Sequence, residues 1–331
     1  MLVKRAFALV VLLGVVTAVL FAVPSDHYLF LPDRARPVDP LVAVPDEPDQ
    51  AGAEDEDGGV YMVDILVRKA SLAERLFPGL ADGASLVPGH AVNPVGVPET
   101  ERRQSSLNEM SRSQQIAVTV ALRSLGYDVE VREQGLEIDT VVPGKPADGK
   151  LQVGDVLLRA DGDPARTRED LLDAMEDIRP GEEVEVTVLR DGKRVRLQLG
   201  TEPAEDDPDR AVFGVIVVQA ADFDFPVDVE IDAGDIGGPS AGLAFALDVV
   251  DELGEDVDSG RTVVATGELT LEGDVLPIGG IKQKVIGARR AGADVFLVPD
   301  RNAADARAAA DGLEIVAVSD FDEALSALAA A

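Results

Sequence analysis

Residues 232–243 read Asp-Ala-Gly-Asp-Ile-Gly-Gly-Pro-Ser-Ala-Gly-Leu, and this stretch decides how the C-terminal half of the chain is interpreted. It joins a short strand-like run to an apolar segment that continues to about Leu253, so we expect a Gly-rich turn into a helix. Ser240 is expected in the first helical turn, where backbone N–H groups have no intrahelical partner. With Gly237 and Gly238 it could present an oxyanion hole. A serine near a helix start is also a common cap, so its position alone does not identify a nucleophile.

A nucleophilic serine needs a neighbouring base to accept its proton. The chain has no cysteine, and its two histidines, His27 and His90, lie far upstream of Ser240. A Ser-His-Asp triad within this segment is therefore excluded, as is a His-rich metal centre. The remaining choices of base are a carboxylate or a lysine kept neutral by burial.

From Thr201 onward the only lysines are Lys282 and Lys284, in a segment predicted to be helical from about Gly280. At about 100° per residue, one side of that helix forms an apolar stripe of Ile281, Val285, Ala288 and Ala291. Lys284 falls on this stripe, whereas Lys282 points away from it with Arg289. Because a lysine that faces a core is costly unless neutral or paired, the periodicity predicts Lys284 as the base.

Four blocks of this region occur in a characteristic order: Gly238–Gly242, Thr266–Glu268, Leu276–Lys284 and Val298–Asn302. With these blocks, residues 206–331 resemble the proteolytic domain of Lon proteases. The resemblance implies that Ser240 and Lys284 form a catalytic dyad and that Thr266 hydrogen-bonds the lysine amine. ATP-dependent Lon enzymes often have Asp where this chain has Gly237, so a gating role for that acid is not carried over. The AAA+ module of those enzymes is absent from the sequence as well.

The middle of the chain shows a strand, a turn, a strand, a helix from Arg168 to Ile178 and a hairpin, in that order. This pattern resembles a PDZ domain of the kind found in bacterial envelope proteases. The resemblance implies that a peptide adds a strand beside a loop and that side chains of the helix line an apolar groove. The implied loop is Gly135, Leu136, Glu137 and Ile138, and the implied groove residues are Leu171 and Leu172. A small structural domain without peptide binding is the alternative.

The segment Gly144–Lys150 has the spacing of a phosphate-binding P-loop as far as its lysine. Leu151 follows where a serine or threonine should bind Mg²⁺, and no helix pattern comes after it. We therefore expect no nucleotide binding. The formal charge of −32 likewise disfavours nucleic acid, because phosphate contacts need clustered lysine and arginine. No cofactor and no metal are expected.

At the N-terminus, Lys4 and Arg5 precede a charge-free apolar run from Ala6 to Val23. A helix of that length spans roughly 27 Å, close to the hydrocarbon thickness of a bilayer. Positive charge stays on the cytoplasmic side, so the sequence predicts a single-pass anchor with the rest of the chain outside the cell membrane. A cleaved signal peptide is the alternative. Further along, residues 46–59 predict a flexible acidic spacer, Val60–Val67 a strand, and Ser106–Leu125 a helix with no assignable chemistry.

The predicted fold class is α/β, a Lon-type proteolytic domain with a β-rich PDZ-like domain and an N-terminal transmembrane helix. The predicted parts are an anchor (1–24), an N-terminal region (25–125), the PDZ-like domain (126–201) and the proteolytic domain (206–331). This layout looks like that of membrane-anchored PDZ and Lon-like proteins of Gram-positive bacteria. It implies an ATP-independent, membrane-anchored serine endopeptidase that cleaves unfolded or flexible protein segments and forms a homo-oligomer. The rival is a non-catalytic PDZ peptide-binding scaffold with a degenerate protease domain.

Overall fold

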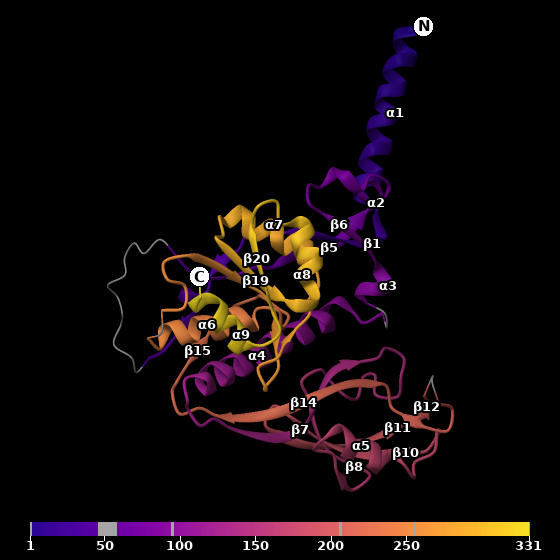
Figure 1. Ribbon diagram of the computed structural model, residues 1–331. Helices are drawn as coiled ribbons and strands as arrows, with labels where there is room; N and C mark the ends of the chain where they lie inside the picture. The colour runs from indigo at the N-terminus through magenta and orange to yellow at the C-terminus, as the bar shows by residue number, and fades with distance from the viewer. Residues whose placement is uncertain (1, 46–57, 94–95, 205–206, 255, 331) are drawn as a thin grey trace. The chain divides into compact units, whose positions relative to one another are not determined.

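The computed structural model describes residues 2–45, 58–93, 96–204, 207–254 and 256–330. Most of the predicted acidic spacer lies outside these ranges. The chain divides into two compact units (Figure 1). The first unit comprises Met1–Pro40, Asp49–Pro94 and Leu243–Ala331, and the second comprises Leu41–Pro48 and Val95–Gly242.

The first unit is built on a five-stranded sheet in which four strands are parallel and one edge strand is antiparallel. In sheet order the strands are β2 (Arg36–Pro37), β4 (Gly59–Met62), β16 (Thr262–Ala265), β19 (Val295–Pro299) and β20 (Glu314–Val318). Every residue of β19 is buried, as expected for a central strand of a parallel sheet covered on both faces.

The described helices of this unit are mostly short. They are α1 (Leu2–Ala22), α2 (Leu72–Leu76), α3 (Gly89–Val92), α6 (Gly242–Glu252, from the unit boundary), α7 (Ile281–Ala291), α8 (Ala303–Ala309) and α9 (Phe321–Ala329). Helices α7 and α8 pack on the sheet through Val285, Ala288 and Ala306, against Phe296 and Val298 of β19. One hydrophobic core thus fixes α7 over the parallel strands.

A smaller three-stranded sheet and one short hairpin complete the strands of this unit. The sheet order is β5 (Ile65–Ser71), β1 (Pro24–Pro32) and β6 (Ser85–Pro88), and the hairpin joins β17 (Glu268–Leu269) to β18 (Val275–Leu276). The strand predicted for Val60–Val67 is divided between β4 and β5, with Val63 and Asp64 between them. The break frees the Val63 carbonyl from a sheet ladder, and its oxygen accepts a bond from α7 instead.

The apolar run at the N-terminus forms α1, whose described large apolar side chains, such as Phe7 and Leu9, are exposed. Among the helices in the described ranges, none is both long enough and apolar enough to cross a membrane. The predicted transmembrane anchor is therefore not confirmed.

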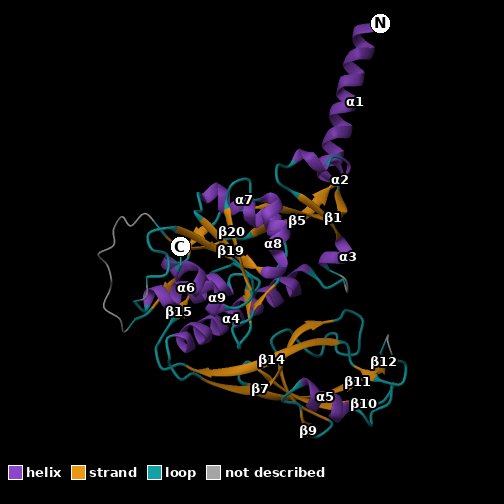
Figure 2. Ribbon diagram, viewed as in Figure 1, coloured by secondary structure: helices purple, strands orange, loops and turns teal. Residues whose placement is uncertain are grey.

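The second unit is mainly antiparallel sheet (Figure 2). Its main sheet runs in the order β11 (Lys193–Gly200), β10 (Glu183–Arg190), β8 (Val156–Ala160), β7 (Glu130–Val141) and β14 (Val215–Asp224), with β9 (Asp163–Pro164) paired to β8. Two-residue pairs join β12 (Glu202–Pro203) to β13 (Ala211–Val212) and β15 (Glu230–Ile231) to β3 (Val42–Ala43). Its described helices are α4 (Glu99–Ser124) and α5 (Arg168–Met175).

Strand β14 pairs with β7 along nearly its whole length, from Val215 opposite Val141 to Asp224 opposite Glu130. Sequence patterns assign residues 206 onward to the proteolytic domain, yet this strand completes the sheet of the PDZ-like region. Phe213, immediately before β14, packs in the same core as Leu136 and Ile138.

Gly287 on α7 marks the closest approach between a helix and the strands beside it. A Cβ atom there would overlap the Asp33 carbonyl oxygen and lie 2.8 Å from Val63. We therefore expect Gly287→Ala to lower the free energy of unfolding by about 1–3 kcal/mol, since α7 must shift away. Gly79→Ala is the control, because a Cβ there meets nothing within 4 Å. Equal urea midpoints for the two variants would show that this approach is not tight.

Candidate active site and peptide groove

Lys284 is buried in the middle of α7. Its side chain is 2% exposed, whereas Lys282 is exposed, as the apolar periodicity predicts. The Lys284 Nζ donates hydrogen bonds to the Val63 carbonyl oxygen at 2.6 Å and to Thr266 Oγ1 at 3.1 Å. Thr266 is itself fully buried directly after β16. The two residues that the sequence places together thus meet in the core.

Two glycines of α7 allow this burial. Gly287 lies three residues after Lys284, on the same face of the helix, and its missing side chain lets α7 approach Val63. Gly280 begins the helix at φ +71°, in the left-handed region, and a Cβ there would lie 2.8 Å from Ile65. Only glycine fits both the conformation and the space at this position.

Burial lowers the pKa of Lys284 from 10.5 to about 8, while the nearby Asp64 charge acts to raise it. Burial also raises the pKa of Asp64, and the positive charges of Lys284 and Arg36 act in the opposite direction. The Arg36 guanidinium lies 3.8 Å from Asp64 and 2.9 Å from Asp33. At neutral to mildly alkaline pH the Lys284 amine therefore becomes a proton acceptor more readily than a surface lysine.

Asn302 links two of the sequence blocks. Its Oδ1 accepts a hydrogen bond from the Ile278 N–H at 2.8 Å, and its Nδ2 donates to the Ile278 carbonyl at 3.1 Å. Since Ile278 lies just before α7, the Val298–Asn302 block fixes the segment that leads to Lys284.

Ser240 lies in the second unit, half-buried in the turn that leads directly into α6 and two residues before the helix begins at Gly242, so it is not in the first helical turn as expected. The turn is fastened to α4 by two hydrogen bonds. The Gly238 N–H donates to the Ser106 carbonyl at 2.7 Å, and the Ser113 Oγ donates to the Pro239 carbonyl at 3.0 Å. Helix α4 therefore holds the turn that carries Ser240 through these two hydrogen bonds.

The first of these bonds corrects the predicted role of Gly238, while the expected role of the Gly237 N–H stays a prediction. The Gly238 N–H already has a partner, so in this arrangement it is not a donor for an oxyanion hole. A Cβ at Gly237 would lie 2.5 Å from Ser106 Oγ, so no side chain fits there without a shift. Both glycines shape the turn: Gly238 by its φ of +89° and Gly237 by its close approach to α4.

The contribution of α4 was missed by sequence reasoning, which gave residues 60–125 no chemistry. Ser106 and Ser113 are seven residues apart, close to two helical turns, so they lie on one face. Two serines on one face of a predicted helix could have indicated a polar contact with another segment. They do not indicate which loop that segment would be.

An apolar groove of about 650 Å³ lies in the second unit between α5 and the start of β14. The predicted groove residues Leu171 and Leu172 line it from the helix, opposite Val215 and Ile216 of β14. Strand β14 is the last strand of its sheet in the described chain, so its outer edge offers backbone groups for strand addition. Residues of the segment before β14, from Asp207 to Gly214, also line the groove.

The predicted peptide-binding loop Gly135–Ile138 is wrong. These four residues lie inside β7, which pairs with β8 on one side and β14 on the other. Leu136 and Ile138 are core residues, 2% and 0% exposed, and a Cβ at Gly135 would lie 2.5 Å from the Leu157 carbonyl oxygen. A strand paired on both edges cannot accept a further strand.

Comparison with known proteins identifies two domains. The family model of the Lon protease (S16) C-terminal proteolytic domain matches residues 219–330, and that of the PDZ domain matches residues 124–201. The chain is 41% identical to the Lon protease of Rickettsia felis over 108 residues, 31% of this chain and 14% of that protein. It is 46% identical to the Lon protease of Azorhizobium caulinodans over 92 residues, 27% of this chain and 11% of that protein. The chain thus spans a small fraction of these curated relatives.

Among solved structures, a protein from Geobacillus thermodenitrificans is 30% identical and matches 26% of this chain and 98% of its own, with a TM-score of 0.24. The PDZ domain of an SdrC-like protein from Listeria monocytogenes is 18% identical and matches 27% of this chain and 93% of its own, with a TM-score of 0.25.

The lowered pKa of Lys284 makes a prediction about stability. Between about 8 and 10.5 the unfolded lysine binds a proton that the native amine has lost, so stability contributed by this site rises with pH across that window. Lys284→Met carries no such proton. The free energy of unfolding of the parent, relative to that variant, should increase from pH 8 to pH 10 and stay level from pH 6.5 to pH 7.5. Urea titrations at each pH measure it, and a difference that falls with pH would contradict the burial of a neutral amine.

Proposed function

We propose, from the premise that this chain carries a Lon (S16) C-terminal proteolytic domain and a PDZ domain, that it is a serine endopeptidase with Ser240 as nucleophile and Lys284 as general base. The observation that carries the proposal is the buried Lys284 amine, held by Thr266 and the Val63 carbonyl with its pKa lowered to about 8. A basic amine removed from water in a protein core is costly to keep charged, and general-base catalysis is a function that such a group serves.

Covalent connectivity supports the pairing of Ser240 with Lys284. Ser240 precedes Leu243 by three residues, which can span at most about 11 Å of chain. The Leu243 N–H donates to the Gly267 carbonyl at 3.1 Å, and Gly267 directly follows Thr266, the hydrogen-bond partner of Lys284. The chain therefore tethers the serine near the residue that positions the amine.

In the proposed reaction the neutral Lys284 amine takes the proton of the Ser240 hydroxyl while Oγ attacks the carbonyl carbon of the scissile bond. The resulting ammonium gives its proton to the leaving amine, which departs and leaves an acyl-enzyme. Water, deprotonated by the same amine, then hydrolyses the ester and restores Ser240. Thr266 keeps the Lys284 Nζ in place throughout.

We propose that catalysis needs no nucleotide. The segment Gly144–Lys150 is a run of turns without a following helix, so it lacks the strand-loop-helix context of a phosphate-binding loop. Without coupled unfolding, the substrates are flexible or already unfolded segments of proteins. The groove on β14 would present such segments by adding them as an extra strand.

We also propose that α1 tethers the chain to a membrane, with the domains outside the cytoplasm and several copies assembled together. The support for the tether is the charge-free apolar run after Lys4 and Arg5, together with the exposed apolar side chains of α1. Protease accessibility of intact cells tests the topology: digestion only after the membrane is opened would contradict it.

The dyad is tested by two lysine variants two residues apart. Lys284→Arg should lower kcat/KM on an unstructured peptide by about 10³-fold or more, because a guanidinium keeps its proton at any usable pH. Lys282→Arg, on the exposed side of α7, should keep most activity. Ser240→Ala should be as inactive as Lys284→Arg, and the activity of the parent should rise with pH through an apparent pKa near 8.

The rival function, a peptide-binding scaffold without catalysis, gives different results in the same assays. It predicts no turnover in any variant and no labelling of Ser240 by a fluorophosphonate in the folded protein. Loss of activity in Lys282→Arg with retention in Lys284→Arg would overturn the dyad. Added ATP should change the rate of peptide cleavage by less than twofold.

The groove is tested by a charge placed in its apolar lining. Leu172 and Ile216 are 48% and 47% exposed within it, so Leu172→Asp and Ile216→Asp should fold normally. Both should weaken cleavage of a flexible protein substrate several-fold and leave cleavage of a short peptide nearly unchanged. The control is Leu80→Asp, 55% exposed in the other unit. Equal losses on both substrates would mean that the groove is needed to build the active site.

A further inference from the structure

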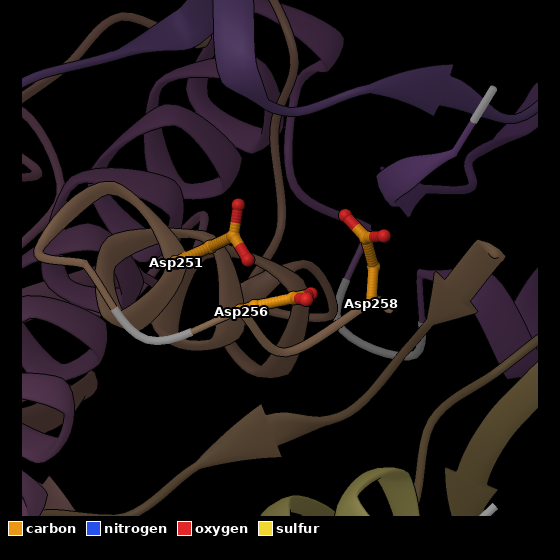
Figure 3. Close-up of side chains that lie close together, drawn as sticks. All are labelled: Asp251, Asp256 and Asp258. Atoms are coloured by element: carbon orange, nitrogen blue, oxygen red, sulfur yellow. The ribbon is translucent and has the colours of Figure 1, made fainter. Parts of the chain in front are cut away.

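Three aspartates gather where α6 ends and the segment to β16 begins: Asp251 in the last turn of α6, and Asp256 and Asp258 after it. One carboxylate oxygen from each residue lies within 4.8 Å of the other two, and Figure 3 shows the three side chains close together. Asp251 and Asp258 are half-buried and Asp256 is exposed. The cluster therefore opens to solvent on one side.

The loop itself orients each of these carboxylates. One oxygen of Asp251 accepts the Val257 N–H at 2.9 Å, and one of Asp256 accepts the Ser259 N–H at 2.7 Å. One oxygen of Asp258 accepts the Gly260 N–H at 2.5 Å. Each side chain is thus held by one oxygen, and no hydrogen bond joins its second oxygen to another described residue.

Asp248 is an independent observation beside this cluster. Its side chain is 3% exposed, and its Oδ2 has no hydrogen-bond partner within the described part of the chain. It precedes Asp251 by three residues and Glu252 by four, so the three carboxylates project from one face of α6. An unpartnered oxygen that is buried on this face is costly unless a positive charge lies nearby.

In the described part of the chain, no salt bridge neutralises these carboxylates. Among the described residues, no ion pair joins Asp39, Asp248, Asp251 or Glu252 to a lysine or arginine, nor Asp256 or Asp258. The neighbouring Arg261 donates to the Asp258 and Leu328 carbonyl oxygens. Burial, and after it the charges of Glu252 and Asp39, raise the pKa of Asp248 to about 9. The cluster therefore carries repulsion that a cation would relieve.

We propose that Asp251, Asp256 and Asp258 bind one divalent cation, with Ca²⁺ as the preferred ion, and that the charge of this cation also acts on the unpartnered Asp248 carboxyl group one helical turn before Asp251. All candidate ligands are oxygens, which excludes a preference for soft metals. One ligand lies in the last turn of α6 and two in the irregular segment after it, and Ca²⁺ accepts variable geometry more readily than Mg²⁺. This site is independent of the proposed peptidase reaction.

Such a cation would fasten the connection from α6 to β16. Helix α6 follows the turn that carries Ser240, and β16 leads directly to Thr266. The expected effect is on stability of this connection, which can be measured without any proteolytic assay.

The test uses the full chain freed of metal with a chelator. At constant ionic strength, calorimetric titration should show saturable Ca²⁺ binding with one site per chain and at least tenfold weaker Mg²⁺ binding, and Ca²⁺ should raise Tm. The double variant Asp256→Asn with Asp258→Asn should lose at least tenfold in Ca²⁺ affinity. The control is Asp305→Asn with Asp322→Asn, which changes the net charge equally at exposed positions away from the cluster.

If the double variant does not fold, the exposed Asp256→Asn alone should still weaken binding. Absence of saturable binding in the parent, equal affinity for Mg²⁺, or the same loss of affinity in the control pair would overturn the proposal.

Discussion

The arrangement of α7 in the first unit depends on the free-energy cost of burying the Lys284 amine. Lys284 is almost completely removed from water, and an amine there must find acceptors or lose its proton. The Val63 carbonyl and Thr266 Oγ1 supply the acceptors, one from the break between two strands and one from the end of a buried strand. The placement of α7 against both segments follows from this requirement. Gly287 allows the approach on one side, and the left-handed Gly280 starts the helix at the right point.

Local patterns were sufficient to find this part of the site. The 3.6-residue period of a helix places Lys284 on the same side as the apolar residues of α7 and Lys282 on the other side. In the structure Lys284 is buried and Lys282 is exposed, as this pattern predicts. The bond between Thr266 and Lys284 was implied by the resemblance to Lon proteases and not by periodicity, and the structure contains it. The choice of Lys284, in contrast, needed only its neighbours along the same helix.

Other features depend on contacts between distant segments, which periodicity does not encode. The bonds from Ser106 and Ser113 to the turn before Ser240 join residues more than 120 positions apart, so the use of the Gly238 N–H could not be foreseen. The peptide-binding loop was misplaced for a related reason. Gly135–Ile138 reads as a glycine-led loop until β14, about 80 residues later, is seen to pair with it. The acidic cluster was overlooked because metal reasoning had considered histidine and cysteine, and in a chain with 62 acidic residues three aspartates in one loop are easily taken for a solvated surface.

Strand β14 shows why the boundary between the PDZ-type and Lon-type regions differs when it is taken from sequence patterns and when it is taken from contacts in the structure. The Lon-type family model begins at residue 219, inside β14, and the PDZ model ends at residue 201, before it. Yet β14 is hydrogen-bonded to β7 along its length and lines the apolar groove with its first residues. The same continuous segment then passes through β15 to the turn held by α4, which carries Ser240. The groove and the serine turn therefore belong to one hydrogen-bonded unit, and the covalent link from Gly242 into α6 is where that unit passes into the one that contains Lys284.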